Sequence, residues 1–126
     1  MTVFNYRHKV VTYEFGFLYP SRNVTERTHH LKFHKWKKGF MNQIKMEIES
    51  QGLVKFDGKV KIYVDLWFKN KMRRDLDNYS PKYLLDALVK AGVIVDDNKN
   101  IITESPDVMI FESEPEQKMI VRIEEI

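Results

Sequence analysis

Between residues 25 and 50 the large apolar side chains recur at helical spacing. One of them stands at every third or fourth position: Phe33, Trp36, Phe40, Ile44 and Ile48. That interval places them on one face of an α-helix. Gly52 follows this pattern, and glycine is a common residue just beyond a helix end. We therefore predict one long helix over Thr25–Ser50.

Other segments alternate between apolar and polar residues, which is typical of β-strands with one buried face. The clearest is Lys59–Phe68, with a branched apolar residue at every second position from Val60 to Leu66. Weaker strand patterns cover Val10–Tyr19, Asp107–Glu112 and Lys118–Glu124. Val93–Val95 and Ile101–Ile102 are shorter apolar pieces.

A shorter helix is predicted over Pro81–Ala91. Ser80 suits its N-cap, Pro81 suits its first turn because proline fixes φ, and Gly92 suits its end. The order is therefore strand, long helix, strand, short helix and further strands. We expect an α/β or α+β fold with a small mixed sheet, in a single domain over residues 1–126.

Composition narrows the class of protein. Apolar residues make up 43% of the 126 residues, which is enough core material for a folded chain. There is no cysteine, so disulfides and thiolate zinc sites are excluded. No apolar segment is long enough for the core of a signal peptide or for a membrane span. We expect a cytoplasmic protein.

Charge is distributed unevenly along the chain. Residues 1–90 contain 18 Lys and Arg against nine Asp and Glu, whereas residues 91–126 contain three against nine. Four lysines lie mostly outside the apolar face of the long predicted helix: Lys32, Lys35, Lys38 and Lys45. Such a surface suits a polyanion such as DNA, although an ordinary solvated surface has the same pattern.

Acidic residues follow the central predicted strand and the shorter helix. Asp75 and Asp77 point the same way if the chain is extended there, with Leu76 toward the core. Asp96 and Asp97 come after the helix, and a strand-helix-return path brings them back beside the first pair. Converging carboxylates at a sheet edge supply the oxygen ligands that Mg²⁺ prefers.

Basic residues flank these acids: Lys71, Arg73, Arg74 and Lys82. A site that handles phosphate needs them, because carboxylates alone would repel the substrate. A bound Mg²⁺ can activate a water and orient a phosphodiester for hydrolysis. The alternative is structural: the aspartates form turns and caps, and Lys82 pairs with Asp86 four residues further on.

Three further patterns carry less weight. An EF-hand loop starting at Asp75 is disfavoured because its sixth position is Ser80 instead of glycine. His30 and His34 have a zinc-ligand spacing, but no Glu follows His30, so surface or DNA-facing histidines are favoured. The aromatic residues of the long helix are interpreted as core rather than as a surface for stacking bases.

Five sequence elements follow one another in a fixed order after the central strand. They are Asp75-Leu76-Asp77-Asn78, then Lys82 at the helix start, Asp86-Ala87-Leu88, Gly92 and Asp96-Asp97. This order resembles the RusA family of Holliday junction resolvases over about residues 60–102. One position departs from the family pattern: Lys82 lies five residues after Asp77, whereas many members have four.

The resemblance implies the roles of individual residues. It places the metal-binding and catalytic carboxylates on Asp75, Asp77 and Asp97, with Asp96 as a possible neighbouring ligand, and the active-site lysine on Lys82. We also expect a set of basic residues to contact DNA: Lys32, Lys35, Lys38, Lys71, Arg73 and Arg74.

The resemblance also implies an activity. It indicates an Mg²⁺-dependent endodeoxyribonuclease, with Mn²⁺ as a substitute metal, that resolves four-way junctions and related branched DNA. It implies a homodimer that makes paired symmetric nicks with 5′-phosphate and 3′-hydroxyl ends, in phage or prophage recombination and DNA repair. The competing interpretation is a non-catalytic module that binds DNA through the basic helix.

Overall fold

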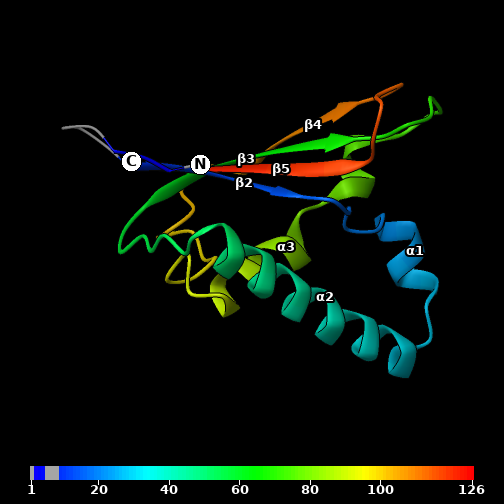
Figure 1. Ribbon diagram of the computed structural model, residues 1–126. Helices are drawn as coiled ribbons and strands as arrows, with labels where there is room; N and C mark the ends of the chain where they lie inside the picture. Colours follow the sequence, from blue (N-terminus) through cyan, green and yellow to red (C-terminus); the bar gives the residue numbers. More distant parts are fainter. Residues whose placement is uncertain (1, 5–8) are drawn as a thin grey trace.

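The computed structural model describes residues 2–4 and 9–126. Within these residues the chain forms a five-stranded sheet with helices covering one of its faces (Figure 1). The strands are β1 Thr2–Phe4, β2 Lys9–Phe15, β3 Val60–Trp67, β4 Asp107–Phe111 and β5 Lys118–Glu125. The helices are α1 Arg22–Arg27, α2 His30–Gln51, α3 Lys82–Lys90 and the short 3₁₀ helix η1 Leu76–Tyr79.

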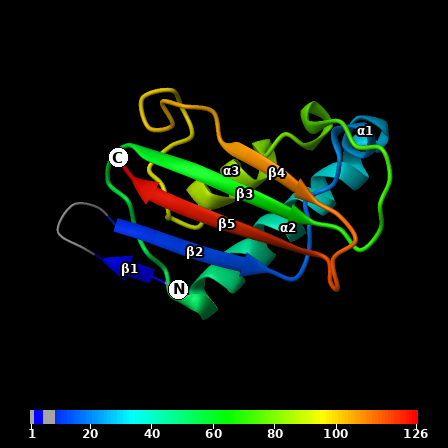
Figure 2. The same cartoon turned by 90° about the horizontal axis from the view of Figure 1, so that it is seen from above.

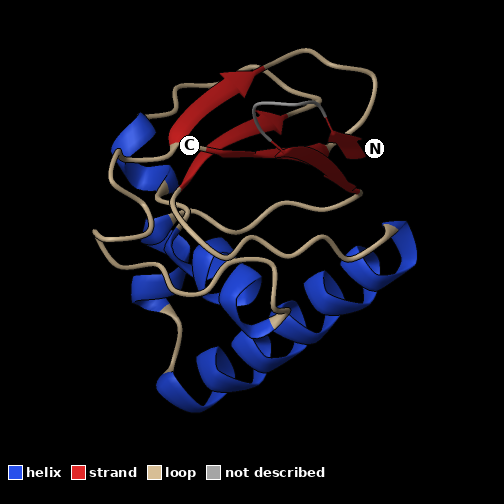
Figure 3. Cartoon of the chain, turned by 90° about the vertical axis from the view of Figure 1, so that its left-hand side faces the viewer, coloured by secondary structure: helices blue, strands red, loops and turns tan. Residues whose placement is uncertain are grey.

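The sheet is mixed, as predicted. Its strand order is β1-β2-β5-β3-β4, and among the described residues only the β3–β4 pair is parallel. Val64 in β3 lies opposite Val121 of β5 on one side and Val108 of β4 on the other. The two layers, strands above and helices below, are seen edge-on in Figure 3. The predicted fold class, with one long and one shorter helix, is confirmed.

Alternation in the strands determines which face of the sheet is covered. Val60, Ile62, Val64 and Leu66 of β3 are all fully buried, and the residues between them are partly exposed. Met119, Val121 and Ile123 of β5 repeat the pattern. These side chains meet the apolar faces of α2 and α3, which lie beneath the strands when the sheet is seen from above (Figure 2).

The predicted helix over Thr25–Ser50 is wrong at its start, because two helices occupy the segment. Thr28 has ψ 133° and His29 has ψ 138°, so the chain is extended between α1 and α2. The Thr28 hydroxyl donates a hydrogen bond to the Val24 carbonyl at 2.7 Å, and such local bonds compete with helix continuation. The predicted end is right: Gly52 caps α2 with φ 107°.

Smaller differences concern the element boundaries. Pro81, not Ser80, occupies the N-cap of α3, and no side chain in the described part of the chain caps this helix by a hydrogen bond. Val93 and Ile94 are buried without forming a strand. Strand β1 was not predicted from the sequence. None of the helices in the described part of the chain is long and apolar enough to cross a membrane.

Helices α2 and α3 run side by side in the same direction. Tyr83 at the start of α3 packs edge-on against Phe33 and Trp36 of α2, with ring centroids 5.3 and 5.8 Å away. One turn further along both helices, Lys37 Nζ lies 3.4 Å from Asp86 Oδ2. Trp36 also stacks on the buried Phe40 at 5.2 Å. The interpretation of these aromatic residues as core is therefore confirmed for Phe40 and Trp36.

Arg74 anchors the loop between β3 and α3. Its side chain is only 5% exposed and is ion-paired with Glu112, while one guanidinium nitrogen donates to Asn70 Oδ1 at 2.6 Å. The guanidinium lies 3.8 Å from the centre of the Phe68 ring. Glu112 also accepts a hydrogen bond from the Met72 amide at 3.0 Å. These contacts tie the loop to the end of β4.

Gly92→Ala should destabilise the protein, because Gly92 has φ 85° and a side chain is strained in that conformation. We expect the free energy of unfolding to fall by about 1 kcal/mol, measured by urea denaturation. Gly39→Ala is the matched control, since Gly39 lies within α2 and an added Cβ meets nothing within 4 Å. That variant should be stabilised by up to about 1 kcal/mol. Equal stability of the two variants would contradict the strained backbone conformation inferred for a side chain at position 92.

The Glu112 carboxylate should make the loop acid-sensitive. The Met72 amide and Arg74 hold the pKa of Glu112 below its ordinary value of 4.5. A depressed folded-state pKa contributes stability above the unfolded pKa, and this stability is lost as pH falls through the folded pKa. Below about pH 4.5 the melting temperature of the wild type should therefore drop more than that of Glu112→Gln. Identical pH profiles of the two proteins, followed by circular dichroism, would contradict this.

Candidate active site

The acidic segment after β3 is not extended, contrary to the expectation from its sequence. Asp75 itself is extended, with φ −94° and ψ 132°, but Leu76–Tyr79 form the 3₁₀ helix η1. The Asn78 amide donates to the Asp75 carbonyl at 3.0 Å and closes the turn. Asp75 and Asp77 therefore do not share one side of a strand. The expectation that Leu76 faces the core is also wrong, because Leu76 is 58% exposed.

Three elements hold η1 in place. The buried Tyr19, which follows β2, donates its hydroxyl to the Tyr79 carbonyl at 2.7 Å. The Asn23 amide at the start of α1 donates to Asn78 Oδ1 at 2.9 Å. The Tyr79 ring packs edge-on against Phe68 at 5.5 Å. The two aspartates therefore project from a backbone that is fixed by hydrogen bonds and packing.

Both aspartates are exposed and have basic neighbours. Asp75 Oδ1 lies 3.9 Å from Nε of Arg73, and both side chains are open to solvent. Asp77 lies within electrostatic reach of Arg22: Glu26 is the main cause of the raised pKa of Arg22, and Asp77 adds to it. The positive charges offset part of the repulsion that two free carboxylates would exert on a phosphate.

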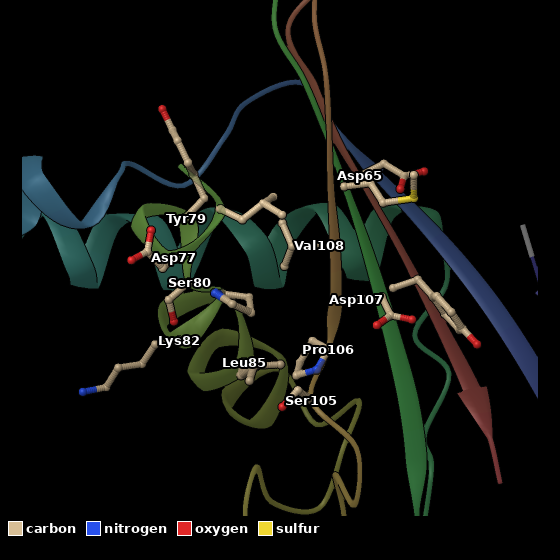
Figure 4. A pocket seen from close by; sticks show the side chains of 14 residues that line it. Asp65, Asp77, Tyr79, Ser80, Lys82, Leu85, Ser105, Pro106, Asp107 and Val108 are labelled. Carbon is tan, nitrogen blue, oxygen red and sulfur yellow. The ribbon is translucent and has the colours of Figure 1, made fainter. Parts of the chain in front are cut away.

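Lys82 is the first residue of α3, and its side chain is exposed. The structural alternative for this residue, an ion pair with Asp86, is wrong, because Asp86 pairs with Lys37. Lys82 and Asp77 instead line the same pocket, which has a volume of about 790 Å³. Figure 4 shows Asp77, Ser80 and Lys82 grouped on one side of β4.

The same pocket continues around the edge strand β4. Tyr63 and Asp65 of β3 and Asp107 of β4 line its other part, on the sheet face away from α3. Burial raises the pKa of Asp65, and Arg122 partly opposes this. Asp107 pairs with Lys61 at 3.4 Å. These residues were not predicted as site residues, because strand alternation marks them as ordinary outward-facing positions.

Asp96 and Asp97 lie in the loop after α3 and have different surroundings. Asp96 forms the turn: its Oδ1 accepts from the Asp97 amide at 2.7 Å and its Oδ2 accepts from Asn98 Nδ2 at 3.0 Å. The Asp97 carboxyl lies close to that of Asp86 in α3, near enough for the two charges to interact. Partial burial raises the pKa of Asp97, and its contacts with Asp96 and Asp86 raise it further.

The structure thus places the predicted carboxylates in separate surroundings. Asp77 joins Lys82 at the pocket, and Asp97 joins Asp86 along α3. In the described part of the chain, no three Asp, Glu, His or Cys side chains are close enough together to hold a metal ion. The proximity of Asp86 to Asp97 was not foreseen, since it depends on the path of the loop after Gly92.

The predicted DNA-binding residues lie on different surfaces. Lys32 and Lys35 line a groove with Phe17 and Leu18, whereas Lys38 lies on the opposite flank of α2 beside Lys90. Lys71 and Arg73 are exposed in the loop before η1. Arg74 is enclosed within that loop by Glu112 and Asn70, which leaves little of it for a DNA contact.

Comparison with known proteins places the chain in a family. The family model for the endodeoxyribonuclease RusA matches residues 19–124, which includes all the elements from α1 to β4 and most of β5. No curated protein matches the chain closely enough to be counted as a relative. Since the family model spans most of the sequence, the chain belongs to the RusA family of Holliday junction resolving endodeoxyribonucleases.

Proposed function

We propose that this protein is an Mg²⁺-dependent resolvase whose catalytic carboxylates are Asp75, Asp77 and Asp97. The observation that supports this most directly is the open pocket that Asp77 and Lys82 both line. It lies within the segment matched by the family model. At one accessible site, a carboxylate can bind a cation and an ammonium group can bind a phosphate.

The donor chemistry of the three aspartates fits Mg²⁺, with Mn²⁺ as a substitute. All three are exposed, and they offer only carboxylate oxygens, which hard cations prefer over nitrogen or sulfur. The three aspartates match Mg²⁺ in the type of ligand atom that they offer. They do not form a single cluster in the described residues. Asp96 is a further possible ligand, although its carboxylate is engaged in its own turn. When bound, Mg²⁺ would supply a water of lowered pKa and stabilise charge on the phosphate.

The protein residues of the site have separate roles in the proposed reaction. Lys82 offers an ammonium that can contact the attacked phosphate or the leaving oxygen as negative charge develops there. Arg73 and Lys71 attract the DNA backbone to the exposed loop. Arg74 acts through the loop: its pairing with Glu112 keeps the backbone before Asp75 in place.

We further propose that the substrate is a four-way junction and that the protein acts as a homodimer. A junction with two-fold symmetry requires two nicks, and an isologous dimer presents two equivalent sites. The expected products carry a 5′-phosphate and a 3′-hydroxyl. Recombination and repair of phage or prophage DNA is the proposed setting. A DNA-binding module without catalysis is the alternative, because the three aspartates do not form a ready metal cluster.

Asp75→Asn should abolish cutting while junction binding stays equal or becomes tighter, because one carboxylate that repels phosphate is removed. Cutting is measured with a labelled four-way junction in Mg²⁺, and binding by gel shift in Ca²⁺ or EDTA. Asp57→Asn is the control, since Asp57 is an exposed loop residue outside the site. If Asp75→Asn cuts at the wild-type rate, Asp75 is not a catalytic ligand. Wild-type binding without any cutting would favour the binding module.

Lys82→Ala should lower the single-turnover cleavage rate by roughly 100-fold or more, with a much smaller change in the junction Kd. This is the pattern of an interaction made mainly in the transition state. Lys59→Ala, an exposed lysine beside the start of β3, serves as the charge-matched control. A variant that loses affinity but keeps its rate at saturating protein would make Lys82 a DNA contact only.

A further inference from the structure

A groove with a basic lining runs between α2 and α3. It has a volume of about 360 Å³ and is lined by His34, Lys37, Lys38, Met41, Asn42 and Lys90. Among the described residues, no acidic side chain lines it. The parallel packing of the two helices produces this groove, because it places Lys90 at the end of α3 beside the middle of α2.

The cations of this groove are only partly neutralised by the protein. In the part of the chain that the structure describes, Lys37 is the only groove lysine with an ion pair, to Asp86 at 3.4 Å. Lys38 and Lys90 are exposed at the groove. Holding like charges together destabilises a fold slightly, and a polyanion that binds there offsets the repulsion.

The groove leads to one of the candidate catalytic carboxylates. Lys37 contributes to its lining and is ion-paired with Asp86, whose carboxylate lies close to that of Asp97. On α3 itself, Lys82, Asp86 and Lys90 succeed one another at intervals of four residues, so they lie along one side of the helix. Eight residues at 1.5 Å each put Lys82 and Lys90 about 12 Å apart along the axis.

We propose that this groove binds backbone phosphates of the DNA strand that is cut, a few nucleotides from the scissile phosphate. Lys38, Lys90 and His34 hold the strand at one end of α3, it passes Asp86 and Asp97, and it reaches Lys82 at the other end. This proposal extends the proposed function to a DNA-binding surface, and it rests on the proposed function for the position of the cut. The groove with Lys32 and Lys35 is less suited to this path, since Phe17 and Leu18 line it and no site carboxylate adjoins it.

The contribution of the groove can be measured without any cutting. Junction binding is followed by fluorescence anisotropy in EDTA over a range of KCl concentrations, for wild type and for the double variant Lys38→Gln/Lys90→Gln. Each lost phosphate contact should make the slope of log K against log[KCl] shallower by about 0.9, so by roughly 2 for the pair. Affinity at 0.1 M KCl should fall on the order of 50-fold. The control Lys55→Gln/Lys59→Gln removes two exposed lysines outside the groove.

A shallower slope in the groove variant alone, with circular dichroism unchanged, supports the proposal. An unchanged slope, or an equal loss in the control, overturns it. Junctions with single neutral methylphosphonate linkages then locate the contact. The linkage that weakens wild type but not the groove variant should lie on the cut strand, within about four phosphates of the nick. If that linkage lies on an outer arm of the junction, the proposed path of the strand is overturned. Groove-dependent binding by a protein that never cuts would uphold the groove and refute the resolvase.

Discussion

The packing of α2 and α3 on one face of the sheet is the constraint on which the other features depend. Every second residue of β3 is apolar and fully buried, so that face must be covered. The apolar stripes of the two helices cover it side by side and in the same direction. Tyr83 joins them by packing against Phe33 and Trp36. Moving α3 along α2 by one turn would separate Lys37 from Asp86 and remove the basic groove.

The candidate active site is built at the ends of these packed elements. Asp75 precedes the short 3₁₀ helix η1 and Asp77 lies within it, and Tyr19, Asn23 and Arg74 fix the backbone around them. This combination keeps carboxylates accessible at a defined place, as is usual for functional residues on a rigid scaffold. Asp97 belongs to a second loop, which Gly92 turns back along α3.

The surface around α3 has a negative region and positive regions. Carboxylates occupy its middle, at Asp86 and Asp97, and cations occupy both ends, at Lys82 and Lys90. Phosphate binding at the cations can bring a strand close to acids that would otherwise repel it. A cation held by the carboxylates would reduce the same repulsion. The arrangement agrees with an endonuclease of the RusA family, which acts on branched DNA.

The main elements and the family could be predicted from the sequence alone, because strand alternation, helix period and the order from Asp75 to Asp97 depend only on local spacing. The sequence did not determine the break at Thr28–His29 or the 3₁₀ turn at Leu76–Tyr79, where local hydrogen bonds override periodicity. Nor did it pair Asp86 with Lys37 or place it beside Asp97. These contacts arise in the folded protein, since they join distant segments whose proximity depends on how two helices pack against a sheet.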